Sequence, residues 1–303
     1  MTPHVDQVVE EVEDYSGKRC LFLEIQILEN TPRSVKLYIK GIKLHVLNSI
    51  RRVMISDVPT MAIDYVIFME NSSVFYDEYL AHRLGLIPLK SDIALEKYKP
   101  PEECAEAGEK GVFSEDCFAK FDLEAEGPES GKLVVYSKDL IPSDPSVVPV
   151  YDNIPIAELV KGQRIKLEAY ARLGRGREHI KWSPVSVATH KFIPIITIHS
   201  ERCLGNACLK CVNACPRNVF IVVNNNVIVD ETSKLKCNFC KLCEEICPNN
   251  AIRVSYKENE FILNIELVNS LSAKNVLITA ISILNKKIEE FKAMLIKHGV
   301  LNE

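Results

Sequence analysis

Eight of the eleven cysteines in this 303-residue chain are crowded between positions 203 and 247, and no other feature constrains the fold so strongly. The later half of this segment reads C-x2-C-x2-C-x3-C-P, and the earlier half repeats the pattern with two extra residues in its first gap. Repeated thiolates at such spacings are typical of metal ligation rather than of disulfide frameworks, above all in a reducing compartment. The segment is therefore expected to fold around bound metal. The eight cysteines are Cys203, Cys208, Cys211, Cys215, Cys237, Cys240, Cys243 and Cys247.

The C-x2-C-x2-C-x3-C-P run is typical of ferredoxins that hold two iron–sulfur clusters. Three closely spaced cysteines of each run bind one cluster, and the fourth cysteine binds the other cluster. Short strands at 219–223 and 227–229, joined by a turn of three asparagines, predict a hairpin between the two halves. A two-cluster, ferredoxin-like domain is therefore expected over 200–253. Because the fourth cysteine of each run binds the cluster of the other run, the ligation is crossed. It predicts a first quartet of Cys203, Cys208, Cys211 and Cys247 and a second quartet of Cys215, Cys237, Cys240 and Cys243.

Two alternatives concern the bound metal. Paired C-x2-C knuckles also bind zinc, but zinc needs only four thiolates, and eight thiolates in two such runs favour clusters of the 4Fe-4S type. Because the gap between Cys203 and Cys208 is wider, the type of cluster in the first quartet is not fixed by the sequence. At that site we expect a 4Fe-4S cluster, a 3Fe-4S cluster, a labile cluster or none.

Three cysteines lie outside this segment. Cys104 and Cys117 are thirteen residues apart, with no histidine or second cysteine pair near them, so two ordinary thiols are expected there. Cys20 falls in a predicted strand and is expected to be a buried apolar residue.

The charge balance argues against nucleic acid as a direct ligand. The net charge is −4, so no overall positive field attracts the chain to phosphate backbones, and direct DNA binding is not expected. Residues 1–17 form an acidic extension with five carboxylates and no apolar block, which does not match a secretory signal. Because no stretch approaches the ~20 apolar residues of a membrane helix, we expect no membrane association and a cytoplasmic protein.

Hydrophobic periodicity outside the cysteine segment predicts a mixed α+β fold. The last predicted helix carries one apolar stripe and would span about 39 Å, which is long for a self-contained core. Part of that stripe is therefore expected to pack on a partner chain, with an intramolecular core helix as the alternative. Strands are expected at 20–29, 34–40, 61–69, 132–136, 164–173, 185–198 and 260–267, helices at 43–56, 77–84 and 273–298, and a loop over 99–131.

Five further segments carry a resemblance that covers nearly all of positions 19–298. They read LNSIRRVM at 47–54, DVPTMAI at 57–63, DEYLAHRLGLIPL at 77–89, DPSVVP at 144–149 and GREHIKWSPV at 176–185. The chain resembles the alpha-like assembly subunits of DNA-directed RNA polymerase, and specifically the archaeal members of that family that carry an inserted ferredoxin-like domain.

The resemblance implies an arrangement of domains and a set of partners. An alpha-like dimerisation domain in three parts (18–58, 186–199 and 254–303) would be interrupted by a mostly β insert domain at 59–185 and by the ferredoxin-like domain. The helices at 43–56 and 273–298 would pair with the smaller subunit L as a heterodimer. The largest and second-largest polymerase subunits would then assemble on that platform.

The resemblance also suggests contact residues. In the family, the helix face of Asn48, Arg51 and Arg52 meets the second-largest subunit, whereas without the resemblance these are residues of a solvated helix face. The basic stretch 172–177 lacks the strand-to-helix context of a phosphate loop, so a contact loop for a large subunit is preferred. His82 and His179 are expected to serve packing or hydrogen bonding.

Two functions follow, from different classes. The first is a non-enzymatic assembly platform in transcription, whose clusters stabilise the inserted domain; the nucleotidyltransferase chemistry would belong to the complex, because the sequence contains no triad, no acid pair and no magnesium-binding aspartate cluster. Loss of the clusters would then couple iron supply or redox state to assembly. The alternative is a ferredoxin-type electron-transfer protein, which the eight cysteines alone would favour.

Overall fold

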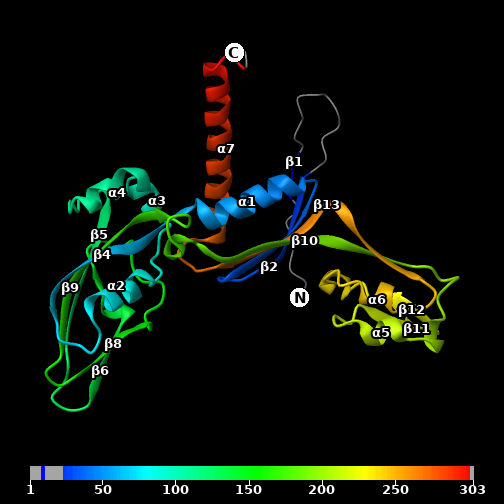
Figure 1. Ribbon diagram of the computed structural model, residues 1–303, viewed down its shortest axis with the longest axis horizontal. Helices are drawn as coiled ribbons and strands as arrows, with labels where there is room; N and C mark the ends of the chain where they lie inside the picture. Colours follow the sequence, from blue (N-terminus) through cyan, green and yellow to red (C-terminus); the bar gives the residue numbers. More distant parts are fainter. Residues whose placement is uncertain (1–7, 11–22, 301–303) are drawn as a thin grey trace. The chain divides into compact units, whose positions relative to one another are not determined.

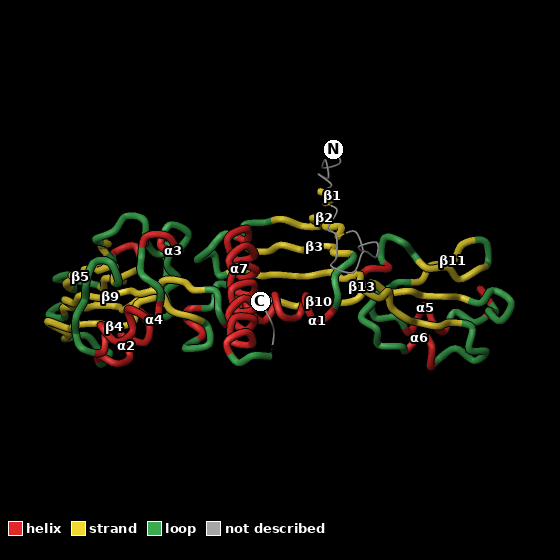
Figure 2. Tube along the Cα trace, turned by 90° about the horizontal axis from the view of Figure 1, so that it is seen from above, coloured by secondary structure: helices red, strands yellow, loops and turns green. Residues whose placement is uncertain are grey.

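The computed structural model describes residues 8–10 and 23–300, which form two compact units. Unit 1 contains the described residues up to Leu28, Leu37–Leu44 and His190–Leu263. Unit 2 contains Glu29–Lys36, His45–Thr189 and the described residues from Asn264 onward. Strand predominates over helix in this mixed fold (Figure 2). The prediction for Cys20, and most of the acidic extension, lie outside the described residues.

A five-stranded sheet has the strand order β1-β2-β3-β13-β10. Thr31 closes the β2–β3 hairpin, because its Oγ1 accepts a hydrogen bond from the backbone N–H of Ser34 at 2.9 Å. The predicted hairpin is confirmed within the described residues. β13 begins eight residues before the predicted strand, because Ile252 and Val254 already alternate with exposed residues. The five strands are β1 (Val8–Glu10), β2 (Leu23–Asn30), β3 (Ser34–Lys40), β10 (Val185–Ile198) and β13 (Ile252–Leu267).

A second sheet in unit 2 has the order β4-β9-β5-β7, with antiparallel pairing throughout. Buried and less buried residues alternate along β5 and β9, so one face of each strand enters an apolar core that includes Phe121, Met61 and Ile63. A separate two-stranded sheet pairs β6 with β8. The strands are β4 (Pro59–Asn71), β5 (Phe118–Glu126), β6 (Lys132–Tyr136), β7 (Ile141–Pro142), β8 (Pro155–Val160) and β9 (Arg164–Arg175).

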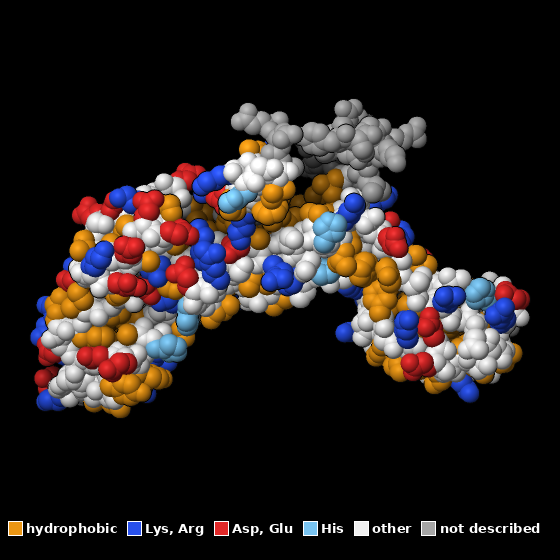
Figure 3. Space-filling view, turned by 45° about the horizontal axis from the view of Figure 1, so that its top comes forward, with side chains coloured by type: hydrophobic (Ala, Val, Ile, Leu, Met, Phe, Trp, Pro, Cys, Tyr) orange, Lys and Arg blue, Asp and Glu red, His pale blue; other side chains and the backbone are white. Residues whose placement is uncertain are grey.

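Short helices accompany this sheet. They are α2 (Asp77–Gly85), α3 (Ala94–Lys97) and α4 (Pro101–Glu109), with 3-10 turns η1 (Ser137–Asp139) and η2 (Ile180–Trp182). Leu80 and Leu84 of α2 are buried in the same apolar core. Acidic and basic side chains are interspersed over the visible surface of the body that contains β4, β5 and β9 (Figure 3).

The loop predicted over 99–131 is wrong, because the structure places α4 and β5 there. Pro101 stands at the first position of α4, and Glu102 and Glu103 lie in its first turn, which are favourable residues for a helix start. The alternating burial of Phe118–Glu126 is the period-2 pattern of a half-buried strand. Scattered glycine, proline and glutamate around these two elements concealed them.

The prediction of two ordinary thiols in this region is also wrong. Cys104 of α4 and Cys117, just before β5, form a disulfide with a Cα–Cα distance of 5.4 Å. Both residues are buried, and Tyr65, Phe113 and Tyr170 pack around them. Sequence spacing could not reveal the bond, because α4 must first fold back toward the sheet to bring the two residues together.

Two long helices complete unit 2. α1 (Leu44–Ser56) and α7 (Ala273–Lys297) match the predicted helices closely. Ser272 caps α7 by accepting a hydrogen bond from the N–H of Asn275, and Gly299 follows the helix with a φ of 70°. Only Val276 and Ala280 of α7 are buried. Within the described residues, no helix combines the length and apolarity needed to cross a bilayer.

The cysteine segment lies in unit 1 as a pair of short helices and a hairpin (Figure 1). Asn224 and Asn225 have φ values of 49° and 63°, as a two-residue hairpin turn with positive φ at both positions requires. The predicted hairpin is therefore confirmed. The elements are η3 (Gly205–Ala207), α5 (Lys210–Ala214), β11 (Phe220–Val223), β12 (Asn226–Val229), η4 (Lys234–Lys236) and α6 (Leu242–Glu245).

Candidate metal centre

The first quartet surrounds a single cavity in unit 1. Its four cysteines line a small space that has no carboxylate or imidazole among its lining residues. Cys247, the last cysteine of the second run, thus lines the same space as the trio of the first run. The cysteines lining it are Cys203, Cys208, Cys211 and Cys247.

Electrostatic interactions connect three members of each quartet. Burial raises the pKa of the Cys211 thiol, and the neighbouring Cys203 and Cys247 raise it further. Burial likewise raises the pKa of Cys243, to about 11, with added effects of Cys237 and Cys215. In both cases the fourth cysteine of one run acts on the trio of the other run. A positively charged metal would offset this resistance to ionisation, since metal ligands must be thiolates.

The fourth cysteines of the two runs occupy matching surroundings. The Sγ of Cys215 accepts a hydrogen bond from the N–H of Val219 at 3.5 Å, and the Sγ of Cys247 accepts one from the N–H of Ala251 at 3.2 Å. Hydrogen bonds to sulfur stabilise thiolates and tune iron–sulfur centres. The repeat seen in the sequence is thus present in the local hydrogen bonding.

The loops of the two trios share one backbone feature, directly after the second cysteine of each run. Leu209 and Lys241, each directly after the second cysteine of its run, have φ values of 50° and 59°. Cys208 is right-handed helical and Leu209 left-handed, the sequence of conformations that turns successive N–H groups toward an anion. Such backbone concavities hold many iron–sulfur sites, so the loop suits a cluster with negatively charged sulfides.

The two extra residues of the first run form part of η3. The N–H of Asn206 donates to the carbonyl of Asn225 at 2.9 Å, which fixes η3 against the β11–β12 turn. Gly205 is required there, because a Cβ would lie 2.2 Å from the carbonyl oxygen of Asn225. The longer gap is thus accommodated without removing Cys203 or Cys208 from the cavity.

The donor set fits clusters better than a zinc ion. The cavity of the first quartet offers thiols alone, which are the ligands of iron–sulfur clusters. A cubane takes each thiolate on a different iron atom, whereas zinc needs four ligands around one point. Among the described residues, no three cysteine, histidine or acidic side chains are placed to hold one metal ion.

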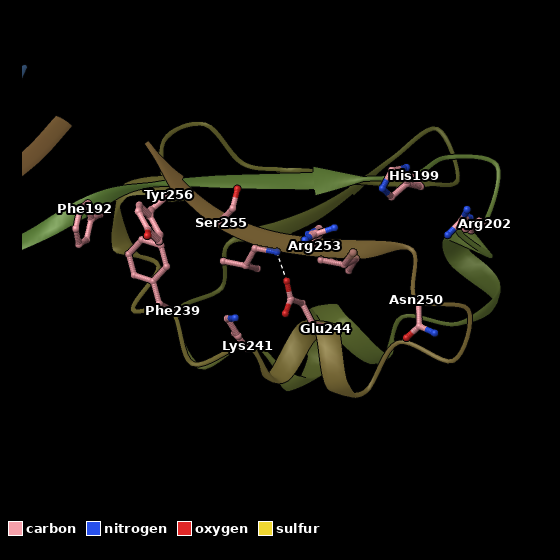
Figure 4. A pocket seen from close by; sticks show the side chains of 12 residues that line it. Phe192, His199, Arg202, Phe239, Lys241, Glu244, Asn250, Arg253, Ser255 and Tyr256 are labelled. Carbon is pink, nitrogen blue, oxygen red and sulfur yellow. Dashed lines mark hydrogen bonds between the residues drawn. The ribbon is translucent and has the colours of Figure 1, made fainter. Parts of the chain in front are cut away.

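A groove runs beside the loop of the second run (Figure 4). Phe239 and Lys241 line it from that loop, and Arg253 and Tyr256 line it from β13. Glu244 of α6 accepts a hydrogen bond from the N–H of Val254, which connects α6 to β13. The two sequence neighbours of Cys240 thus line this groove.

The predicted contact residues on α1 have different environments. The guanidinium of Arg51 donates to Oδ1 of Asn48 at 2.9 Å and to the carbonyl of Ala188 at 3.2 Å, so it holds α1 against β10. Arg52 is exposed. Of the three predicted residues, Arg52 is therefore the one most available to another chain.

The basic stretch 172–177 is partly a structural network. Arg172 is buried and forms ion pairs with Asp64 at 2.7 Å and with Glu178 at 3.2 Å. Its guanidinium also lies 4.5 Å from the ring of Trp182. Sequence inspection missed this role, because the acidic partners are distant in sequence or belong to another motif.

Arg175 and Arg177 lie closer to the surface. Arg175 pairs with Glu102 of α4 at 2.7 Å, and Arg177 lies 3.7 Å from the buried carboxylate of Asp57. Asp57 also pairs with Lys287 of α7 at 2.6 Å. No sequence pattern indicated this connection between the end of α1 and α7.

The two histidines differ as well. The Nδ1 of His179 accepts a hydrogen bond from the N–H of Lys181 at 3.1 Å and caps η2, so the predicted hydrogen-bonding role is confirmed. His82 lies exposed on α2. Both histidines lie outside the cysteine segment.

Comparisons with known proteins identify relatives over most of the chain. The DNA-directed RNA polymerase subunit Rpo3 of Methanosarcina mazei is 42% identical over 273 residues, which cover 90% of this chain and 98% of the relative. The subunit Rpo3 of Archaeoglobus fulgidus is 42% identical over 272 residues, covering 90% and 97%. That of Aeropyrum pernix is 38% identical over 280 residues, covering 91% and 96%.

Two family models match parts of the sequence. The RNA polymerase Rpb3/RpoA insert domain matches residues 65–200, and the 4Fe-4S dicluster domain matches residues 200–263. The second match supports iron–sulfur binding by the cysteine segment. The likeness to polymerase subunits over nine-tenths of the chain does not favour an electron-transfer protein of the ferredoxin type.

Proposed function

Because the chain belongs to the Rpo3 family of archaeal DNA-directed RNA polymerase subunits, we propose that it is a non-catalytic platform on which that enzyme assembles. Its place as a structural subunit of the polymerase rests on relatives of which it covers almost the whole length. We assign the nucleotidyl-transfer chemistry to other chains of the complex, since the sequence has no aspartate cluster for catalytic magnesium. With this assignment, the chain is proposed to act in the cytoplasm.

The proposed dimerisation domain comprises 18–58, 186–199 and 254–303, interrupted by the insert domain at 59–185 and the ferredoxin-like domain at 200–253. The match of the insert-domain model to 65–200 supports an insert domain that follows α1, although the match also extends over 186–199. The match of the dicluster model to 200–263 supports the ferredoxin-like domain and extends into 254–263. The arrangement leaves α1 and α7 in one domain although more than 200 residues separate them, and the Lys287–Asp57 ion pair joins them.

The C-terminal half of α7 is the proposed contact with the smaller subunit L. Ile288, Phe291 and Met294 are 54%, 59% and 54% exposed, although they are large apolar residues. Apolar side chains that gather on one helix and stay in contact with water mark a protein interface. A heterodimer would bury them.

Paired substitutions test this interface. We expect Ile288→Asp with Phe291→Asp to weaken pairing with subunit L at least about 100-fold, because two central apolar contacts each contribute about 1.5–2 kcal/mol or more. Ile141→Asp is the matched control, since Ile141 is also an exposed apolar residue, 65% exposed, but lies on β7. Copurification of tagged chain with subunit L measures the effect. Equal pairing of both variants would refute the assignment.

The large subunits are proposed to dock on exposed cations near α1. Arg52 on α1 and Arg177 after β9 are the exposed members of the two predicted contact segments, with half of the Arg177 side chain accessible. We expect Arg52→Glu to lower recovery of the large subunits while leaving pairing with subunit L intact. The measurement is the subunit composition of the purified assembly.

The eight cysteines are proposed to hold two 4Fe-4S clusters in the crossed quartets. The observation that carries this proposal is the cavity where Cys247 of the second run joins the trio of the first run. When bound, the clusters supply binding free energy that is also folding free energy, and an electron-accepting centre. The chain's own thiolates and the N–H groups of the Cys208–Leu209 loop position them.

Iron analysis and single substitutions test the crossed arrangement. Anaerobically purified protein is expected to contain about eight irons and eight sulfides per chain. Cys247→Ser and Cys211→Ser are then expected to leave the same residual paramagnetic spectrum, because both residues serve the first quartet. A Cys247→Ser spectrum that matches Cys237→Ser instead would show that the quartets are not crossed.

A further inference from the structure

Cys208 and Cys240 hold equivalent positions in the two runs but differ in exposure. Each is the second cysteine of its run, and each is followed by a residue with positive φ. Cys208 is half-buried, whereas Cys240 is exposed. The two quartets are therefore unequal at one ligand, and the difference is opposite to what the widened gap of the first run suggests.

The cause of the difference lies in the loop before each cysteine. Residues 204–207 lie between Cys203 and Cys208, and η3 within them is fixed against the hairpin by the Asn206–Asn225 hydrogen bond. Only Asn238 and Phe239 lie between Cys237 and Cys240. The longer loop thus gives Cys208 cover that the shorter loop cannot give Cys240.

The loop that carries Cys240 lies beside an open groove. Phe239 and Lys241, its two neighbours in sequence, both line the groove beside α6 (Figure 4). Small oxidants and chelators in water can therefore reach this loop from that side. The cavity of the first quartet is lined by its own four cysteines together with apolar side chains such as Leu209, Val227 and Ile252, and with Arg202, Lys210 and Asn249.

We propose that Cys240 is the first ligand to release iron when the protein is oxidised, so that the second quartet converts to a three-iron site while the first keeps four irons. This inference rests on the proposed function, because it presumes a cluster in each quartet. It assigns the labile position to the run with regular spacing. Exposure of a ligand, rather than its spacing, then decides where iron is lost.

The chemistry balances with a one-electron oxidant. A 4Fe-4S cluster held by Cys215, Cys237, Cys240 and Cys243 would give one electron to ferricyanide, which would become ferrocyanide, and would release one Fe2+ to leave a three-iron site. Cys240 would keep both electrons of its bond to that iron. The freed thiolate takes a proton from water or reacts with an alkylating reagent.

Stepwise oxidation of the full chain tests the order of release. Protein purified without oxygen is treated with ferricyanide, alkylated with iodoacetamide and mapped by mass spectrometry, while paramagnetic resonance follows the three-iron signal. We expect Cys240 to be alkylated at least about tenfold faster than Cys208, because thiol reactivity follows exposure. Alkylation of Cys208 first, or of both at one rate, overturns the inference.

Serine variants of Cys240 and Cys208 give an independent test of the order of iron release, with Cys208→Ser as the matched control. In Cys240→Ser, ferricyanide is expected to produce no further three-iron signal, because the iron at that position is held weakly from the start. In Cys208→Ser, the oxidant-induced signal from Cys240 is expected to remain. The reverse pattern overturns the inference.

The starting iron content separates the two proposals. Fewer than about four irons per chain before oxidation would overturn both the cluster assignment and the present inference. About eight irons that are lost in a different order would overturn the inference alone.

Discussion

The insert region of unit 2 and the cysteine segment of unit 1 are stabilised in different ways. The main apolar core of the insert region contains 22 buried residues, among them Phe121, Leu80 and Leu159. The core of the cysteine segment contains seven, and two of these are the proposed cluster ligands Cys211 and Cys243. The proposed ligands of the cysteine segment are thus part of its core.

This difference follows from size. A small segment buries too little apolar surface to offset the conformational entropy of folding, and metals or disulfides usually supply the remainder. The insert region has enough apolar surface to form a conventional core. We therefore expect the two regions to depend on different conditions, the insert region on packing and the cysteine segment on iron and a reducing environment.

Removal of iron is expected to have the largest effect and to separate the two regions most clearly. Stripping the clusters leaves eight thiols around the cavities, so 200–252 loses most of its folding free energy. We expect its amide protection from hydrogen exchange to fall to that of an unfolded chain, while β4, β5 and β9 keep theirs. Mass spectrometry of exchanged peptides measures both regions in one sample.

The same sample tests coupling to assembly. If cluster loss signals to the dimerisation domain, stripped protein is expected to pair more weakly with subunit L. Unchanged pairing of stripped protein would argue that the clusters act only within their own segment. If stripped protein kept its amide protection across 203–247, the cysteine segment would not depend on iron for its stability.

A cavity in the insert core is expected to have the next largest effect. Phe121 is fully buried at the centre of that core, so Phe121→Ala removes about 3–5 kcal/mol from its free energy of unfolding. Fluorescence of Trp182, the single tryptophan, reports unfolding of unit 2 in urea. Iron content is expected to stay unchanged, and a parallel loss of iron would show that the two regions fold as one.

The disulfide is expected to contribute somewhat less. The Cys104–Cys117 bond closes a loop of about 15 residues, for which chain entropy predicts about 3 kcal/mol. Replacing both with alanine is expected to lower the stability of the insert region and to speed hydrogen exchange in α4, without changing the iron content. Wild-type protein alkylated under denaturing, non-reducing conditions is expected to leave these two cysteines unmodified, and their modification would refute the bond.

Sequence patterns predicted the elements whose signal is local. The alternation of Ser34–Lys40 gave β3 with its observed bounds, and the apolar spacing of 43–56 gave α1 to within one residue. The α4–β5 region was missed, since both elements lie among turn residues. The central position of β9 between β4 and β5 depends on pairings between residues far apart in sequence, such as Pro59 with Arg175 and Phe118 with Arg172, which periodicity cannot reveal.

The same limit applies to the candidate site. Cysteine spacing identifies the eight thiols and a scheme for dividing them, because ligand spacing follows from how a short loop wraps a cluster. The spacing of the cysteines does not indicate how exposed each thiol is. The contrast between Cys208 and Cys240 depends on η3 docking against a hairpin turn about 20 residues away, which only a folded chain defines.

Loss of the Asp144 charge is expected to have the smallest effect on the stability of the insert region. This effect should depend on pH. Its Oδ2 accepts hydrogen bonds from the Nζ of Lys97 and the hydroxyl of Tyr98, both at 2.7 Å, and its side chain is 8% exposed. Burial acts to raise the pKa of Asp144, but these hydrogen bonds outweigh burial and the pKa is lowered. The carboxylate therefore stabilises the insert region at every pH above the ~3.9 of an unfolded aspartate.

The sign of the pH dependence follows from that shift. As pH falls from about 4 toward the lowered pKa, the unfolded chain takes up the proton first, and the stabilisation is lost. We expect Asp144→Asn to cost about 2 kcal/mol at pH 7 in Trp182-monitored urea unfolding, and its deficit to shrink as the pH is lowered below 4. Asp152→Asn, at an exposed residue of the same region, is the control and is expected to change little at either pH. A deficit that stays constant with pH would mean that Asp144 acts through packing and not through its charge.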